Sequence, residues 1–371
     1  MTVELASTRR IASLDVFRGL TIVLMILVNS QGNEYAYPIL EHAAWNGCTF
    51  ADLVFPFFLF IVGLTSVISL NKNKMNQDAP LYRAILRRSI LLFALGVFLN
   101  IFPKYIDISS LRVYGILQRI AVCYLVSSII YLKASTKVQT LIFLAILWFY
   151  WFMMTQVPVP GYGANHFTVE GTWVAYFDQL IFSSAHLYGT VYDPEGFFST
   201  IPSIATTLSG VLTGSLLLNS MSNQKKFYAM MLFGIIFLLL GWFWNYSFPI
   251  NKNLWTSSFV LWTSGFALIV FALCYLIVDI LNCQCWALPF KIFGMNAIFA
   301  FTFHVLLLKL QFFFYFILKD GSKGNMKAML TEYWFGYYSP PNAALFYSLL
   351  FLLINFIVVS FLYKRKIFFR I

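Results

Sequence analysis

The chain has 371 residues, of which 60% are hydrophobic, 19% are aromatic and only 11% are charged. A soluble domain has about 45–50% apolar and about 25% charged residues, so this chain has too few charges to cover a water-facing surface. The net charge of +11 does not indicate nucleic acid, because the basic residues fall in short clusters between apolar runs, as in membrane proteins.

Apolar segments long enough to cross a bilayer recur along the chain. A helix needs about 20 apolar residues to span the hydrocarbon core. We therefore expect an all-α integral membrane protein, a single domain over 1–371 with about ten transmembrane helices. The segments are 12–30, 51–70, 89–102, 115–132, 138–155, 199–218, 227–245, 257–280, 288–308 and 345–363. The third is short and can extend into Tyr82–Arg88, and the stretch 309–318 is either interfacial or an eleventh crossing.

The basic residues predict the orientation. Ten crossings place both termini on one side. With the N-terminus inside, sixteen Lys and Arg lie in cytoplasmic segments and seven lie outside, which favours an N-in, C-in arrangement. The longest connection, 156–198, is then extracytoplasmic. It has no predicted secondary structure, and its Tyr, Trp, His and Asp content suits an ordered lid.

Several chemistries have no motif in the sequence. Cys283 and Cys285 form a C-x-C with no second pair, so no metal site is expected. A phosphate-binding glycine loop, a zinc-protease motif and a G-x-S-x-G elbow are also missing from the sequence.

Two arginines lie within predicted spans, where ionisable groups are costly and often functional. Arg18 follows Asp15 by three residues at the start of the first span. It is either a residue that extends to the cytoplasmic surface or a contact for a ligand phosphate. Arg119 begins the fourth span and is either satisfied by carbonyl groups or exposed to a polar cavity.

The densest polar cluster lies where the first two spans meet the outer surface. Asn29 ends the first span, His42, Trp45 and Asn46 follow in the loop, and Asp52 begins the second span. Histidine can act as a base or nucleophile near neutral pH. Asn29 can orient the histidine or donate a hydrogen bond to an oxyanion. Asp52 has an alternative interpretation without a chemical role, because a carboxylate is favourable at the N-terminus of a helix.

Two further segments combine carboxylates or amides with aromatic residues. Asp193 and Glu195 lie in a turn before a helix and can present carboxylates to a sugar or amine. Asn251, Asn253 and Trp255 form either an interface anchor or a sugar-binding wall. His304 in the ninth span is interpreted as a helix–helix contact rather than a second base.

At these blocks the sequence resembles the heparan-α-glucosaminide N-acetyltransferase family of transmembrane acyltransferases. The resemblance runs nearly end to end, in the same order, through segments 10–19, 42–47, 51–56, 117–119, 186–188, 192–196, 251–255, 294–296 and 363–368. We expect a bacterial member, in the cytoplasmic (inner) membrane, without the lumenal domain that precedes the first shared span in the lysosomal enzyme.

The resemblance implies that acetyl-CoA is the donor and that His42 and Asn29 are the catalytic residues. On this interpretation His42 transfers the acetyl group from cytoplasmic acetyl-CoA to an amino sugar or glycan on the other side, either through an acetyl-histidine or by direct attack. We assign the remaining candidate residues to three roles. The residues expected to support catalysis are Asp52, Asn46, Trp45 and Arg119. The residues expected to bind the donor are Arg18, Arg119, Lys364 and Lys366, and those expected to bind the acceptor are Asp193, Glu195, Asn251, Asn253 and Trp255.

Two alternative functions remain open from the sequence. One is a permease for amino sugars of the N-acetylglucosamine type, although we find no inverted repeat of the kind that transporters carry. The other is an O-acyltransferase of surface glycans with the same donor. The expected partners are a small-molecule or glycan acceptor, the lipid bilayer and, because some family members dimerise, a second copy of the chain; nucleic acid is not expected.

Overall fold

The structure is a computed structural model that describes residues 11–74, 77–103, 107–318 and 321–369. Within these ranges nine helices are long and apolar enough to cross a membrane, and the number is ten if a helix pair bent by 72° is taken as one span. The spans are α1 (Ala12–Asn29), α2 (Val54–Leu70), α3 (Ala79–Ile101), α4 (Ile116–Lys133), α5 (Thr136–Gln156), α7 (Phe197–Leu218), α8 (Asn223–Trp244), α9 (Ser257–Tyr275), α10 (Leu288–Met295) with α11 (Ala297–Phe313), and α13 (Pro340–Lys364). The predicted all-α membrane protein of about ten spans is confirmed.

Short polar side chains fix the starts of several spans. Asp78, Ser135, Ser222 and Thr256 each accept the backbone N–H three residues further on, at the starts of α3, α5, α8 and α9. Such caps satisfy N–H groups that have no partner within the helix. The third span therefore begins at Ala79, directly after its cap, and includes the predicted extension.

Helices α2 and α7 touch at Gly63 and Gly210. A Cβ atom at Gly63 would overlap the carbonyl oxygen of Thr207, and one at Gly210 would overlap that of Phe60. Small residues allow membrane helices to approach this closely. The contact fixes α2, the helix that continues from Asp52, against its neighbour.

The predicted span 288–308 is broken between α10 and α11. Asn296 lies at the break and is fully buried. Its Nδ2 donates to the carbonyl oxygen of Ile367, and its Oδ1 accepts the N–H of Phe369, both at 3.1 Å. The side chain therefore binds the C-terminal tail to the bend in the span.

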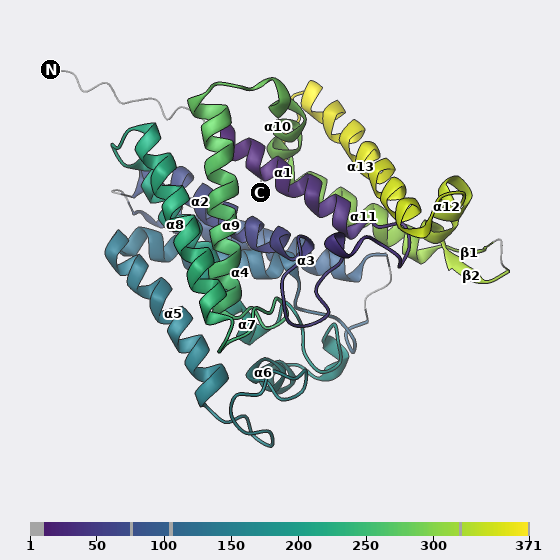
Figure 1. Cartoon of the computed structure of the whole chain (residues 1–371), viewed down its shortest axis with the longest axis horizontal. Helices are drawn as coiled ribbons and strands as arrows, with labels where there is room; N and C mark the ends of the chain where they lie inside the picture. Colours follow the sequence, from purple (N-terminus) through teal and green to yellow (C-terminus); the bar gives the residue numbers. More distant parts are fainter. Residues whose placement is uncertain (1–10, 75–76, 104–106, 319–320, 370–371) are drawn as a thin grey trace.

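The apolar stretch 309–318 is not an eleventh crossing. Its first half completes α11, and its second half forms β1 (Tyr315–Ile317), which pairs antiparallel with β2 (Lys323–Asn325). A short helix, α12 (Met326–Phe335), then leads to α13. The hairpin and α12 lie together at the right of Figure 1.

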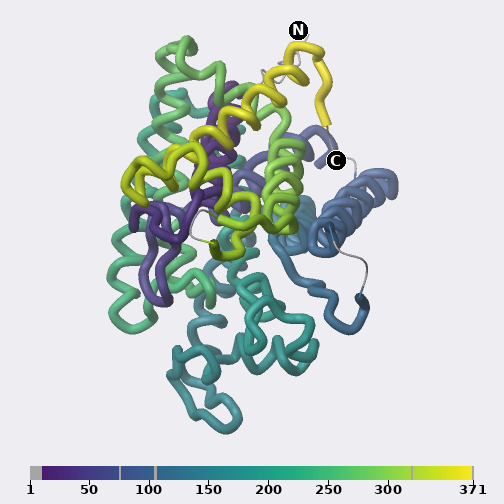
Figure 2. The backbone as a smooth tube through the Cα atoms, turned by 90° about the vertical axis from the view of Figure 1, so that its right-hand side faces the viewer, coloured from purple at the N-terminus to yellow at the C-terminus, as the bar shows by residue number. Residues whose placement is uncertain are grey.

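The connection 156–198 contains α6 (Trp173–Ile181), so the prediction that it has no secondary structure was wrong. Asp178 on α6 accepts the backbone N–H groups of Asp193 at 3.0 Å and Phe197 at 2.9 Å, which ties α6 to the start of α7. Burial raises the pKa of Asp178 to about 6. This segment extends from the lower end of the molecule in Figure 2, where it is drawn in teal.

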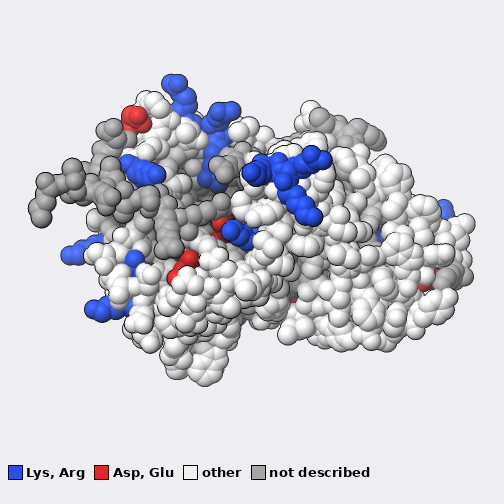
Figure 3. Space-filling view, turned by 90° about the horizontal axis from the view of Figure 1, so that it is seen from above, with Lys and Arg blue, Asp and Glu red and all other residues white. Residues whose placement is uncertain are grey.

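The two ends of the helix bundle differ in charge. The start of α1 and the turn between α9 and α10 lie at the upper end in Figure 1, and α6 lies at the lower end. Figure 3 shows that the upper end carries many more basic than acidic side chains. The basic residues Arg9, Arg10, Lys104, Lys319 and Arg370, which contribute to the predicted orientation, lie outside the described residues.

Candidate active site

The imidazole of His42 and the carboxylate of Asp52 form a hydrogen-bonded pair. Nδ1 of His42 lies 2.7 Å from Oδ1 of Asp52. The other carboxylate oxygen accepts the N–H of Ala43 and both the N–H and the hydroxyl of Thr49, at 3.0, 3.0 and 3.1 Å. An ionised carboxylate only accepts hydrogen bonds, so Nδ1 carries a proton, and in the neutral imidazole Nε2 keeps a lone pair.

The two side chains of this pair differ in exposure. Asp52 is 1% exposed, whereas the side chain of His42 is 49% exposed. The loop thus buries the carboxylate and leaves about half of the imidazole side chain accessible. This is the arrangement that a base or a nucleophile requires.

Lys252, in the loop between α8 and α9, joins the pair. Its Nζ lies 3.3 Å from Oδ1 of Asp52, 3.0 Å from Nδ1 of His42 and 3.4 Å from Nε2. Because Nδ1 already donates to Asp52, the ammonium bonds to the carboxylate and only approaches the ring. A backbone hydrogen bond of 2.7 Å from Gly47 to Ile250 joins the two loops.

These groups line a cavity of about 340 Å³, which we name the His42 cavity. Its polar lining comes from the end of α1 and from four connecting segments, and it includes Asn29, His42, Asp52, Arg112, Tyr188, Glu195, Lys252 and Asn253. Its apolar lining includes Met25, Val28, Val54, Phe55, Phe58, Ile116 and Phe301. The cavity therefore offers both polar partners for a hydrophilic ligand and an apolar surface for a hydrocarbon group.

An ion-pair network borders this cavity. Nε and Nη2 of Arg112 donate to the two oxygens of Asp193 at 2.7 and 2.6 Å, and Nη2 also donates to Oε2 of Glu195 at 2.5 Å. The guanidinium lies 4.8 Å from the ring centre of Tyr188. Burial opposes the charge on Arg112, but the two carboxylates outweigh it and raise the pKa of Arg112 above its ordinary value.

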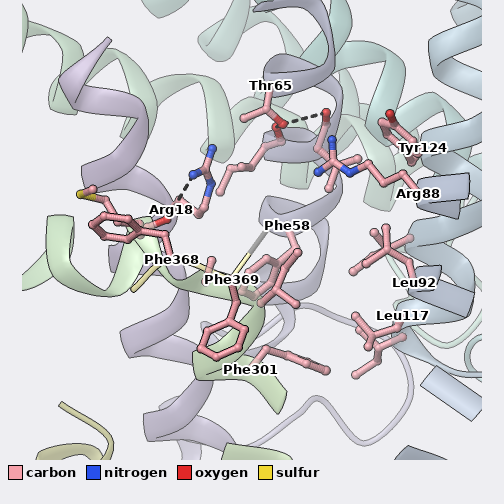
Figure 4. A pocket seen from close by; sticks show the side chains of 18 residues that line it. Arg18, Phe58, Thr65, Arg88, Leu92, Leu117, Tyr124, Phe301, Phe368 and Phe369 are labelled. Carbon is pink, nitrogen blue, oxygen red and sulfur yellow. Dashed lines mark hydrogen bonds between the residues drawn. The ribbon is translucent and has the colours of Figure 1, made fainter. Parts of the chain in front are cut away.

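A second cavity, of about 400 Å³, begins at the other end of α1, and we name it the Arg18 cavity. Figure 4 shows Arg18 and Arg88 pointing into its upper part from opposite sides. Arg18 donates to the carbonyl oxygen of Gly294 at 3.1 Å, and Arg88 lies 4.6 Å from the ring centre of Tyr124. Nε of Arg88 is buried and has no hydrogen-bond partner in the described part of the chain. The rest of the lining is mostly apolar, with Thr65 and Tyr124 as further polar residues. Two guanidinium groups in such a cavity suit an anionic ligand with an apolar part.

The two cavities share three lining side chains. Phe58 of α2, Ile116 at the start of α4 and Phe301 of α11 line both of them. We call these three residues the partition. The two cavities therefore adjoin one another at these three side chains.

The residues assigned to catalysis and to the acceptor fall into two groups. Asn29, Glu195 and Asn253 line the His42 cavity with His42 and Asp52. The others do not line this cavity. They are Asp193, which binds Arg112; Asn46 and Asn251, joined by a hydrogen bond of 3.1 Å; and Trp45, whose Nε1 donates to the carbonyl oxygen of Phe167 at 2.6 Å.

Arg119 and Trp255 are buried together and line neither cavity. Arg119 is 2% exposed, and Trp255 is 1% exposed. The guanidinium donates to Ser199 and to the carbonyl oxygen of Gly196, and it lies 5.0 Å from the ring centre of Trp255. Nε1 of Trp255 donates to Thr206 at 3.0 Å. Both side chains therefore hold α4, α7 and α9 together behind the His42 cavity.

Among the residues assigned to the donor, only Arg18 lines the Arg18 cavity. Lys364 and Lys366 lie at the end of α13 and line neither cavity. The tail that follows them does reach the Arg18 cavity, through Phe368 and Phe369. The C-terminal segment therefore reaches the Arg18 cavity through two phenylalanines and not through the two lysines that were assigned to the donor.

Three basic residues at these cavities were not selected from the sequence. Lys252 lies between Asn251 and Asn253, which were both predicted to bind the acceptor, so its position in that segment was the sequence signal that could have identified it. Arg88 adjoins an apolar run, and from the sequence it was used only as one of the basic residues that predict the orientation in the membrane. Arg112 gives no local signal, because its carboxylate partners lie 81 and 83 positions further along the chain.

Comparison with known proteins gives matches to one enzyme family. The family model for the catalytic region of heparan-alpha-glucosaminide N-acetyltransferase matches residues 10–250. The human (Homo sapiens) heparan-alpha-glucosaminide N-acetyltransferase is 30% identical, with 98% of this chain and 60% of that protein covered. The mouse (Mus musculus) protein of the same name is 31% identical, with 81% of this chain and 54% of that protein covered. The chain thus spans less than two thirds of the length of these relatives, and it belongs to the heparan-alpha-glucosaminide N-acetyltransferase catalytic family.

Proposed function

We propose that this protein is a transmembrane acetyltransferase that moves an acetyl group from acetyl-CoA in the Arg18 cavity to an amine in the His42 cavity. The observation that carries the proposal is the partition, because its three side chains line both a cavity with two guanidinium groups and the cavity with the histidine–carboxylate pair. Membership of an N-acetyltransferase family supports the reaction class.

The Arg18 cavity suits coenzyme A. Guanidinium groups bind phosphate with paired, charge-assisted hydrogen bonds, and both Arg18 and Arg88 reach this cavity. Its remaining lining is mostly apolar and suits the pantetheine arm. Arg18 and Asn29 are eleven residues apart on α1, or about 16 Å at 1.5 Å per residue. A donor that lies along α1 would direct its thioester toward His42.

The basic end of the bundle is then the cytoplasmic side. Figure 3 shows this basic end, and Arg18 lies in the part of α1 nearest to it. Cytoplasmic segments are enriched in Lys and Arg, and coenzyme A is a cytoplasmic polyanion that cannot cross a bilayer. The His42 cavity then faces the opposite side, as expected for a glycan acceptor outside the cytoplasm of a bacterial cell.

His42 is the reactive side chain in this proposal. The hydrogen bond to Asp52 leaves the Nε2 lone pair free either to take the proton of the attacking amine or to attack the thioester itself. In both routes the carbonyl carbon exchanges its bond to sulfur for a bond to nitrogen. The sulfur leaves with the electron pair of the broken C–S bond and takes up a proton, which gives free coenzyme A and an amide.

Other residues of the His42 cavity have supporting roles in this mechanism. Asn29 is a side-chain amide on the cavity wall and can donate to the thioester oxygen as negative charge develops there. Glu195 and Asn253 offer acceptor and donor groups for the ammonium and hydroxyl groups of an amino sugar. The acceptor class that we propose is therefore a terminal glucosamine or a related amine on a glycan.

Product analysis tests this function. Purified protein in nanodiscs is mixed with acetyl-CoA and a panel of sugars that carry an amine, only hydroxyl groups, or an N-acetyl group, and the products are identified by mass spectrometry. We expect acetylated glucosamine, loss of the product in His42→Ala, and normal activity in His166→Ala, which changes an exposed histidine that lines neither cavity. Products on hydroxyl sugars alone would indicate O-acylation, and uptake of N-acetylglucosamine into proteoliposomes without acyl-CoA would indicate a permease; either result would refute the proposal.

A further inference from the structure

The partition is built from large apolar side chains on three separate helices. Phe58, Ile116 and Phe301 are each partly exposed, because each has cavity space on two sides. In Figure 4, Phe58 and Phe301 lie below the two guanidinium groups, and Phe301 lies at the lower end of the Arg18 cavity. Apolar side chains of this kind carry no polar group for recognition, so they can discriminate between ligands only by size and shape.

We propose that the partition determines the acyl-chain length of the donor, with Phe58 as the main determinant. The inference rests on the proposed function, because it concerns the donor of that reaction. It assigns to Phe58, Ile116 and Phe301 a role in specificity, distinct from the chemical role of His42.

The geometry of the donor leads to this role. Its phosphates and its acyl group are at opposite ends of the molecule. If the phosphates bind Arg18 and Arg88, the acyl group is the part that reaches the partition. The C–S bond breaks and the C–N bond forms beside His42, so the acyl carbon must pass the partition before transfer, with any further methylene groups attached to it.

The space beyond the partition limits the length of the acyl chain. The His42 cavity, of about 340 Å³, must hold the acceptor as well as the acyl group. A two-carbon group leaves that space to the acceptor. Each added methylene group must either displace the acceptor or push aside a packed aromatic ring, and overpacking of this kind is unfavourable.

Opening the partition should therefore relax the selection. Phe58→Ala removes a ring from the wall of both cavities and makes room for several methylene groups. We expect the ratio of kcat/KM for hexanoyl-CoA to that for acetyl-CoA to rise by about tenfold or more, because one methylene group in an apolar pocket changes selectivity by at least about that factor. Ile116→Ala removes less volume and should give a smaller rise, and Phe58→Leu should fall between wild type and Phe58→Ala.

The test measures acyl transfer to one amino sugar from acetyl-, butyryl- and hexanoyl-CoA in wild type and the three variants. Phe303→Ala is the matched control, because this phenylalanine is on the same helix as Phe301, packs on Phe299 and lines neither cavity. Release of free coenzyme A without acceptor is recorded in parallel. Thermal melting in the presence and absence of coenzyme A shows which variants are folded, and Phe58→Leu and Ile116→Ala carry the test if Phe58→Ala does not fold.

The outcomes separate this inference from the proposed function. No acetyl transfer by the wild type would refute both. Wild-type acetyl transfer with equal use of hexanoyl-CoA, or with an unchanged chain-length ratio in every folded partition variant, would refute only the role in specificity. A rise in hydrolysis that is the same for all donors would also refute it, because the partition would then exclude water without selecting chain length.

Discussion

Replacing Asp52 by asparagine is expected to reverse the tautomer of His42. Three donors from Ala43 and Thr49 converge on one oxygen of Asp52 at 3.0–3.1 Å, and they will retain an oxygen at that position. The new NH₂ group then replaces the other oxygen and faces Nδ1 of His42, which lies 2.7 Å away. Nδ1 must accept rather than donate, so the proton moves to Nε2 and the reactive lone pair is lost.

The magnitude follows from the loss of this lone pair. An equivalent carboxylate-to-amide change that forces the wrong tautomer in a histidine-dependent hydrolase lowers kcat by about 10⁴. We expect a fall of about 10³–10⁴, or roughly 4–5.5 kcal/mol in the barrier. The combined variant Asp52→Asn, His42→Ala should be no slower than the worse single variant, because the two side chains act as a unit.

The assay is the steady-state rate of acetyl transfer to glucosamine in nanodiscs, with the affinity for coenzyme A measured separately. Affinity for coenzyme A should be unchanged, since Asp52 does not line the Arg18 cavity. Asp107→Asn is the control, because this carboxylate is fully exposed and lines neither cavity. A folded Asp52→Asn variant that keeps more than about a tenth of wild-type activity would refute the reasoning on the tautomer.

Three further predictions concern the segment from 107 to 197. Arg112→Met leaves the fully buried carboxylate of Asp193 unpaired, so we expect a loss of stability of about 3–5 kcal/mol, measured by denaturation in detergent; an unchanged midpoint would contradict this. Gly196→Ala places a Cβ atom on the carboxylate of Asp178 and should lower the melting temperature, whereas Gly189→Ala, with 3.4 Å to its nearest neighbour, should not; equal effects would show that the close contact is unimportant. Burial raises the pKa of Asp178 from 3.8 to about 6, so its contribution to stability is complete below pH 3.8 and is lost as the pH rises through 6, by up to about 3 kcal/mol. Melting curves of Asp178→Asn should lack this dependence between pH 4 and 6, and a dependence equal to that of the wild type would exclude Asp178 as its source.

The spans were predictable because a bilayer requires long apolar helices, which leave a signal in composition alone. The apolar pattern made the third span look short. The structure shows that α3 begins directly after Asp78, whose side chain caps the helix, and a cap of this kind depends only on neighbouring residues in the sequence. The bend at Asn296 was not predicted, since the residues on both sides are apolar and the bend depends on contacts with the tail and with α1.

The candidate site shows the same division between local and distant contacts. His42 and Asp52 are only ten positions apart, and the loop between two spans brings them together, so they could be selected as one cluster. Lys252 reaches the pair from 210 positions away, which only the packed structure shows. Trp255 was an open choice between a surface anchor and a sugar-binding wall, and its burial depends on Arg119 and Thr206, two residues on other helices.

The central claim is that donor and acceptor reach the reacting atoms from opposite sides of the bilayer, and a sidedness experiment tests it most directly. Protein is reconstituted into vesicles selected for one orientation, with acetyl-CoA confined to one compartment and glucosamine to the other. We predict product only when acetyl-CoA faces the Arg18 cavity and glucosamine faces the His42 cavity. Transfer that requires both substrates in the same compartment, or that proceeds with acetyl-CoA on the His42 side, would contradict the claim.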